Sequence, residues 1–277
     1  MSIDKFSFVP EEHGGGQLLD SSPGQKFMKP FDPVYECIQN SIDASIDQNK
    51  SVKLAIHFQK VYTEDFYFFN DVFKEHIKES KKIADRFVLE QDRVELLIME
   101  DFNTTGITGE PDNFDDQTKD GKQNNYFYMN LSCGATQKLE DPRLGGSEGE
   151  GTQAYNLNSE ISTFFYYSID SSSNNRGAFY GITYLGSRKL NTINYLPFAF
   201  FGKKEKNTNS VRESYFSSPV TDEEELLKLT KLFKLKRKKN ESGTSIIIPF
   251  YKKKGIENKE LLIAKIIDVY RAAILRG

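Results

Sequence analysis

The sequence predicts an α+β protein, in which a mixed, largely antiparallel sheet carries helices on one face as a two-layer α/β sandwich. β-prone runs separated by Ser-, Asn- and Gly-rich turns, typical of an antiparallel meander, follow one another at 161–169, 177–185 and 192–201. Amphipathic helical stretches precede and follow them, near 32–48 and 258–275. With 277 residues, of which 38% are hydrophobic, the chain can bury a sizeable core, and we expect one domain.

The N-terminal segment, residues 1–30, is rich in turn formers and poor in apolar side chains, so we expect a flexible arm ahead of a domain spanning 31–277. A helix should begin at Asp32 and Pro33, an N-cap and a first-turn residue, and end near Gln48. Its spacing places four apolar residues on the side away from its polar stripe, where we expect the core: Val34, Ile38, Ile42 and Ile46.

Two strands and an insertion should follow this helix. Residues 52–58 alternate as in a strand with one buried face, and 93–100 form an apolar run typical of a buried strand. Between them, at about 60–90, lies an insertion with an aromatic segment and a charged helical stretch near 72–89. We expect this helix to pack on the body of the domain, with partner binding as the alternative. Acidic residues at 222–225 open a further helix.

The first helix carries a polar stripe. At about 100° per residue, Glu36, Asn40 and Asp43 fall within an arc of roughly 60°. An amide oxygen can ligate a hard cation such as Mg²⁺, and a neighbouring carboxylate can orient or deprotonate a water, which is what nucleotide hydrolysis requires. The alternative is an amphipathic helix whose exposed face is polar.

Three later segments carry further candidates. Asp101 ends the buried strand and is followed by a turn containing Gly106, so its carboxylate could accept a hydrogen bond from an exocyclic amine. A glycine-rich stretch before a helix near 153 could bring backbone N–H groups close to phosphate oxygens. Its candidate contacts are Lys138, Gly149, Gly151 and Thr152. A Gly-Thr pair then places Thr244 at the start of a β-branched strand.

Taken in order over residues 32–250, these segments resemble the GHKL superfamily of ATPases, which includes gyrase, heat-shock chaperones, histidine kinases and MutL. The run Ala135-Thr-Gln-Lys138 is close to the Ala-Thr-Ser-Lys of MutL-type members. The adenine-side pattern differs from the usual Asp-x-Gly-x-Gly, because Asn103 stands at the first glycine position and Gly106 comes one residue late. The resemblance implies a Bergerat-type ATP-binding fold with ATP and Mg²⁺ as ligands.

The resemblance also implies a role for each candidate. Asp101 would select adenine, Asn40 would coordinate the Mg²⁺ that bridges the phosphates, and Glu36 would activate the attacking water. Asp43 would support the site. Lys138, for which a solvated surface lysine is the alternative, would hold the γ-phosphate together with the loop glycines.

Family members use lid closure to drive dimerisation or docking of a following domain, so the resemblance implies the ATPase portion of a larger machine, with a homodimer or a downstream domain as partner. A histidine kinase and gyrase fit less well than a chaperone-like, MutL-like or microrchidia-like protein of DNA processing or defence. The contrasting interpretation is a non-catalytic module of the same fold that binds a protein or nucleic acid.

Composition limits the remaining classes. The formal net charge of −3 gives no global reason to expect nucleic acid, although 231–239 and 252–254 are basic and could form one edge; solvated turns are the alternative. No apolar run is long enough to span a bilayer and no signal-peptide pattern opens the chain, so we expect a cytoplasmic protein without a membrane partner. The two cysteines, Cys37 and Cys133, suggest neither a disulfide framework nor a zinc site.

Overall fold

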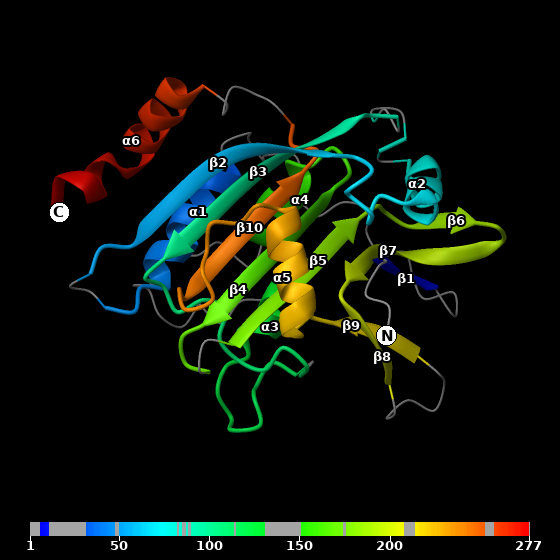
Figure 1. Cartoon of the computed structure of the whole chain (residues 1–277), viewed down its shortest axis with the longest axis horizontal. Helices are drawn as coiled ribbons and strands as arrows, with labels where there is room; N and C mark the ends of the chain where they lie inside the picture. Colours follow the sequence, from blue (N-terminus) through cyan, green and yellow to red (C-terminus); the bar gives the residue numbers. More distant parts are fainter. Residues whose placement is uncertain are drawn as a thin grey trace.

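The computed structural model describes residues 6–10, 32–47, 50–81, 83–84, 87, 90–113, 115–130, 151–173, 176–207, 214–252 and 258–276. Within them, one eight-stranded sheet has the order β1-β7-β5-β4-β10-β3-β2, with β6 paired to β7 (Figure 1). Its strands are β1 (Phe6–Pro10), β2 (Lys53–Tyr62), β3 (Arg93–Phe102), β4 (Thr163–Asp170), β5 (Arg176–Tyr184), β6 (Arg188–Leu190), β7 (Ile193–Phe201) and β10 (Gly243–Pro249). A separate two-stranded sheet pairs β8 (Lys203–Asn207) with β9 (Ser214–Ser218).

The helices are α1 (Asp32–Asp43), α2 (Asp71–Lys78), α3 (Asn125–Asn130), α4 (Gly151–Leu157), α5 (Glu223–Leu232) and α6 (Lys259–Arg276). Every strand pairing in the described part of the chain is antiparallel. The predicted α+β sandwich with a mostly antiparallel sheet is therefore confirmed. None of the helices in these segments combines the length and the apolar character needed to cross a lipid bilayer.

Side chains of β3 alternate between two hydrophobic cores, because successive residues of a strand point to opposite faces of the sheet. Leu97 and Met99 contribute to the core that also contains side chains of α1, α3, α4 and α6. Leu96 and Ile98 contribute to the core on the other face, together with side chains of α2 and α5. Helices α1, α3 and α4 thus lie on one face and α5 and α2 on the opposite face, whereas the sequence predicted helices on one face only (Figure 1).

The buried side of α1 differs from the predicted one. Val34, Cys37 and Ser41 are buried, at the i, i+3, i+7 spacing of a helix face, whereas Ile42 and Ile46 are 49% and 51% exposed. The expectation that these two isoleucines face the core is wrong. The helix also ends at Asp43, earlier than predicted, and a short turn follows it.

The insertion packs on the body of the domain, as expected. Asn70 caps α2 by accepting a hydrogen bond from the N–H of Phe73, at 3.1 Å. The helix ends at Lys78 rather than continuing to residue 89, but Phe73, Ile77 and Ile83 of the insertion are almost fully buried. These side chains extend the core of the α5 face of the sheet.

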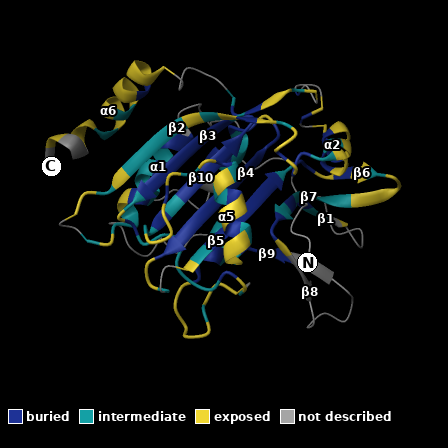
Figure 2. Ribbon diagram, viewed as in Figure 1, coloured by how far each residue is buried: buried dark blue, intermediate teal, exposed yellow. Residues whose placement is uncertain are grey.

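The N-terminal end of the described chain forms a strand of the sheet, and the C-terminal end forms a helix that contacts the core. Within the segment 1–30, expected to be a loose arm, residues 6–10 form β1, which pairs with β7 and buries Phe6. At the other end, α6 contacts the core through Leu262 and Ile266. Most of its remaining surface is exposed, whereas the central strands are buried (Figure 2).

Candidate functional site

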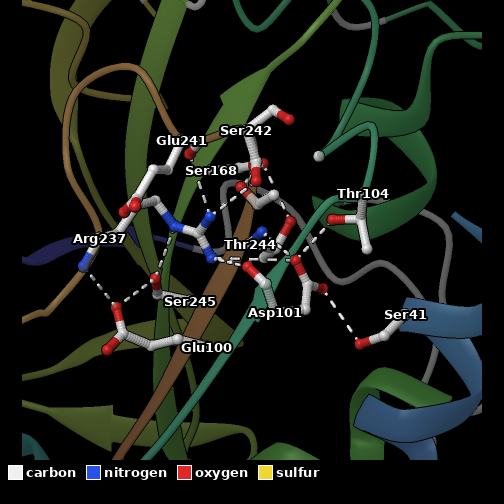
Figure 3. Close-up of polar contacts among 12 residues, drawn as sticks. Ser41, Glu100, Asp101, Thr104, Ser168, Arg237, Glu241, Ser242, Thr244 and Ser245 are labelled. Carbon is white, nitrogen blue, oxygen red and sulfur yellow. Dashed lines mark hydrogen bonds and ion pairs between the residues drawn. The ribbon is translucent and has the colours of Figure 1, made fainter. Parts of the chain in front are cut away.

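Asp101 lies at the end of β3 on the α1 face of the sheet and is only 6% exposed. Its Oδ1 atom accepts hydrogen bonds from the Thr104 hydroxyl, at 2.6 Å, and from the backbone N–H of Thr244, at 2.7 Å (Figure 3). Thr244 comes from β10, next to β3 in the sheet. The structure therefore brings together two of the predicted site residues and fixes the orientation of the carboxylate.

The second oxygen of this carboxylate faces α1. The hydroxyl of Ser41 lies 3.2 Å from Asp101 Oδ2 and 2.6 Å from the carbonyl oxygen of Cys37. A hydroxyl has one proton, so Ser41 can donate to only one of these acceptors at a time, and the shorter contact is the one within the helix. Oδ2 therefore keeps the capacity to accept a hydrogen bond from a ligand.

A buried guanidinium approaches Asp101 from the opposite face of the sheet. Arg237 follows α5, and its Nη2 lies 3.8 Å from Asp101 Oδ1 and donates to the backbone carbonyl of Asp101. Its Nε donates to Ser245 at 3.0 Å, and its backbone N–H donates to Glu100 at 3.2 Å (Figure 3). Arg237 thus joins two consecutive carboxylates of β3 that point to opposite faces.

Gly243 makes room for this arrangement. Its φ is +129°, a conformation that L-residues rarely adopt. A Cβ at this position would lie 2.4 Å from Asp101 Oδ1 and 2.7 Å from Arg237 Nη1. Only a glycine can therefore occupy the position between the two side chains without displacing them.

The charges at the end of β3 do not cancel. Burial lowers the pKa of Arg237, and the negative charges of Asp101 and Glu100 oppose this shift; arginine stays protonated in proteins. His57 Nε2 lies 3.4 Å from Glu100 Oε2, and burial lowers the pKa of His57, against the effect of Glu100. One guanidinium thus faces two carboxylates, which favours a ligand that donates hydrogen bonds over a ligand that brings another anion.

The loop after Asp101 is fixed between α1 and β4. Asn103, at the position where the family pattern has a glycine, has a φ of 63°, a left-handed conformation that Asn tolerates. Gly106 has a φ of 72°, and a Cβ there would lie 2.3 Å from the carbonyl oxygen of Ile169. The N–H of Ile107 donates to the Ser168 hydroxyl, at 2.7 Å, which lies 3.0 Å from the Thr244 hydroxyl. Ile107, which follows Gly106, and Thr244 therefore contact the same serine.

The polar stripe of α1 forms a hydrogen-bonded pair. The amide nitrogen of Asn40 donates to Glu36 Oε1 at 2.8 Å and lies 3.4 Å from the hydroxyl of Tyr155, in α4. This orientation leaves the amide oxygen of Asn40 as the atom that could ligate a cation. Asp43 instead accepts a hydrogen bond from Gln39, at 3.0 Å, along the helix surface.

Tyr155 links the two ends of the candidate site. Burial raises its pKa, and interactions with Cys37, Glu36 and Asp101 raise it further. Glu36 lies in α1, the helix whose Ser41 is 3.2 Å from Asp101 Oδ2, so both carboxylates lie on the α1 face of the sheet. The described residues contain no group of three or more His, Cys, Asp or Glu that could hold a metal.

The remaining predicted phosphate contacts are only partly described. Lys138 and Gly149 lie outside the described residues. Gly151 and Thr152 form the first turn of α4, two residues earlier than the predicted start of this helix. The roles of all four stay predictions.

Sequence reasoning missed Ser41 and Arg237. Ser41 lies inside the motif of α1, but the apolar spacing predicts a buried face made of isoleucines. The residues that are buried are smaller ones. Arg237 belongs to the basic run 231–239, which suggested a solvated or nucleic-acid-binding surface. Its side chain is instead fully buried. The signal that could have identified it is the alternation of Lys with Leu or Arg over residues 234–238.

Comparisons with known proteins give no assignment by sequence: no family model matches the chain, and no curated protein matches it. Among solved structures, the ATPase region of Saccharomyces cerevisiae topoisomerase II is similar with a TM-score of 0.25 and 14% identity. The match covers 83% of this chain and 52% of that one, so the chain spans about half the length of the solved structure. The function is therefore argued from the site itself.

Proposed function

We propose that the chain binds ATP with Mg²⁺ and hydrolyses it slowly, as the nucleotide-driven part of a larger assembly. The observation that carries this proposal is the position of Asp101. Its carboxylate is held by Thr104 and the backbone of Thr244, and its Oδ2 atom faces the same helix that bears the Glu36–Asn40 pair. An adenine amino group donates the kind of hydrogen bond that Oδ2 can still accept.

The other residues take roles that match their chemistry. Gly106 and Thr244 border the adenine side, where Thr244 and Ile107, the residue after Gly106, contact Ser168. Asn40 supplies an amide oxygen to Mg²⁺, which neutralises charge on the phosphates when it is bound. Glu36, hydrogen-bonded to Asn40, orients and deprotonates the attacking water. Asp43 supports the end of the helix.

Lys138, Gly149, Gly151 and Thr152 complete the proposal as phosphate contacts, on the motif order alone. Backbone N–H groups at the start of α4 would face the phosphates. Closing such a loop over ATP would couple nucleotide state to dimerisation or to docking of a downstream domain. A protein of DNA processing or defence is the setting we propose, on the resemblance to MutL-like and microrchidia-like proteins.

The test is isothermal titration of the protein with ATP and Mg²⁺, repeated with GTP. We expect the Asp101→Asn variant to lose at least tenfold in ATP affinity, because an amide cannot offer both acceptor oxygens of the carboxylate. GTP should bind more weakly than ATP, because guanine carries a carbonyl where adenine carries its amino group.

Glu100→Gln is the matched control, since Glu100 precedes Asp101 in β3 and contacts the same arginine from the opposite face of the sheet. This variant should lose stability but keep the ATP affinity of the unchanged protein within about threefold. Equal loss of ATP affinity in both variants would show that Asp101 affects binding through the stability of the fold and not through contact with ATP. No binding at millimolar ATP would leave the non-catalytic binding module as the better interpretation.

A further inference from the structure

A row of exposed lysines lies on the face of the sheet opposite the candidate nucleotide site. Lys234, Lys236 and Lys238, here called the lysine row, are exposed, whereas Leu235 between them is partly buried and Arg237 is buried. Lys234 lies in the turn after α5, with a φ of 51°, and residues 235–238 continue from it without helix or strand. Alternating exposure over 235–238 is the pattern of an extended chain lying on a surface, in which Lys236 and Lys238 are roughly 6–7 Å apart along the backbone.

The segment that carries the row is held by several hydrogen bonds. The backbone N–H groups of Lys236 and Arg237 both donate to the Glu100 carboxylate, at 3.0 and 3.2 Å. The side chain of Gln59, in β2, donates to the carbonyl oxygen of Lys234 at 3.1 Å. The N–H of Lys238 donates to Glu241 at 2.8 Å. The row is therefore anchored along its length, and a ligand would meet lysines whose main chain is already ordered.

The charges of the row have no ion-pair partner among the described residues. Neighbouring lysines do have one: Lys228 contacts Glu224 and Glu225, and Lys239 contacts Glu223 at 2.8 Å. Two acids contact the main chain of the row: Glu100, which is fully buried, accepts from Lys236 and Arg237, and Glu241 accepts from the N–H of Lys238. The ammonium of Lys236 also lowers the pKa of His57, in β2, so its field reaches the sheet beneath.

A second basic side chain extends this surface toward β2. Lys53 is exposed, and its ammonium lies 5.3 Å from the centre of the Phe102 ring. Arg237 lies over the same ring at 4.7 Å. Lys53 and Arg237 thus lie over one ring, and the lysine row together with Lys53 is here called the basic surface.

We propose that this surface binds the phosphate backbone of single-stranded nucleic acid without regard to sequence. Lys236 and Lys238, roughly 6–7 Å apart along the backbone, can contact successive phosphates of one extended strand, and Lys234 adds a cation at the end of the same segment. Lysine is depleted at protein interfaces, so a surface made of lysines fits a phosphate polymer better than an acidic protein. A lipid surface would require exposed apolar side chains between the cations. The two residues between them, Leu235 and Arg237, point inward instead.

The test is fluorescence anisotropy of a labelled single-stranded oligonucleotide of mixed sequence, without ATP, from about 0.05 to 0.2 M salt. The variant that combines Lys234→Gln, Lys236→Gln and Lys238→Gln should raise the Kd at least tenfold near 0.1 M salt. Three lost phosphate contacts should reduce the slope of log affinity against log salt by roughly 2, at about 0.7 for each contact with a single strand. All three lysines are exposed, so the fold should be retained.

The matched control combines Lys78→Gln, Lys119→Gln and Lys189→Gln, which removes the same charge at exposed positions outside the basic surface. It should change neither the affinity nor the slope. Equal weakening by both triple variants, or no binding by the unchanged protein, would overturn the proposal. Tighter binding of a duplex or of anionic vesicles than of the single strand would overturn the assigned partner. Because no nucleotide is present, failure here is distinct from failure of the ATP site.

Discussion

The guanidinium of Arg237 lies 3.8 Å from the carboxylate of Asp101, although Arg237 approaches from the α5 face and Asp101 points to the α1 face. The contact passes the end of the sheet beside Gly243, where a side chain would collide with both partners. Two consecutive acids of β3, one on each face, thus contact one arginine, Asp101 through its guanidinium and Glu100 through its backbone N–H. The compensation of the Asp101 charge, on the face of the candidate nucleotide site, therefore depends on Arg237, whose segment lies on the opposite face.

Replacing Arg237 by Met should destabilise the protein by about 3–5 kcal/mol, because it leaves Glu100 and Asp101 buried without their cation. Urea unfolding followed by circular dichroism measures the change. The control is Arg176→Met, which removes an exposed ion pair with Asp112 and should cost at most about 1 kcal/mol. Similar costs for the two variants would contradict the role given to Arg237.

Substituting Gly243 by Ala should be more damaging than the same change at another glycine with positive φ. At Gly121 the φ is +75° and a Cβ would meet nothing within 4 Å, so Ala should cost only about 1–2 kcal/mol of backbone strain. At Gly243 the same atom collides with Asp101 and its backbone, at 2.4 and 2.5 Å. We expect a larger loss of unfolding free energy and, under the proposed function, weaker ATP binding than in the Gly121→Ala control.

Changing Glu36 to Gln should separate binding from hydrolysis. The amide keeps an oxygen that can accept the hydrogen bond from Asn40 but cannot take a proton from water. We expect the hydrolysis rate to fall by about 10²–10⁴-fold and the ATP affinity to stay within about threefold. Phosphate release and calorimetry measure the two quantities. In the control, Glu75→Gln, which removes an exposed carboxylate of α2 on the opposite face of the sheet, both should change little. Parallel loss of both in Glu36→Gln would mean that Glu36 is structural.

Stability should fall on mild acidification because of His76. This side chain is 2% exposed, stacks on Phe8 and accepts a hydrogen bond from Arg188 Nε at 2.9 Å. Burial, and then the positive charge of Arg188, lower the pKa of His76 from 6.5 to about 4. The folded state therefore binds fewer protons than the unfolded state between these values. Its contribution is complete above about pH 6.5 and is lost as the pH falls toward about 4, by up to about 3 kcal/mol.

The measurement is urea unfolding at about pH 7.5 and about pH 4.5. Carboxylates also titrate in this interval, so the comparison is with His76→Gln, which can still accept a hydrogen bond from Arg188 but does not titrate. The difference in unfolding free energy between the two pH values should be smaller in the variant. An unchanged difference would show that His76 does not set the acid sensitivity.

The strands and the position of Asp101 could be predicted because their signals are local. An apolar run that ends on an acid and a glycine turn needs no knowledge of the rest of the chain. The buried face of α1 could not be predicted in the same way. Hydrophobicity favoured Ile42 over Ser41, yet Ser41 is buried because it meets a carboxylate 60 residues later. A polar group is buried where its partner lies, and the partner is fixed only by the tertiary fold.

Arg237 shows the same limit more clearly. In the sequence it is one of several cations in a basic run, where only the alternation over residues 234–238 indicates that it points inward. Its partners lie 136 and 137 residues away, on β3. The predicted phosphate contacts Lys138 and Gly149 fall outside the described residues, so this half of the site still rests on the motif order.

The position of Arg237 has a consequence for communication through the domain. Its main chain lies between Lys236 and Lys238 on the α5 face of the sheet, while its guanidinium lies near the Asp101 carboxylate of the α1 face. A polyanion that pulled this segment outward would draw the cation away from Asp101 and leave the acid uncompensated. By thermodynamic reciprocity, a ligand bound beside Asp101 would then change the affinity for the polyanion by the same factor. One side chain, that of Arg237, would couple the two sites.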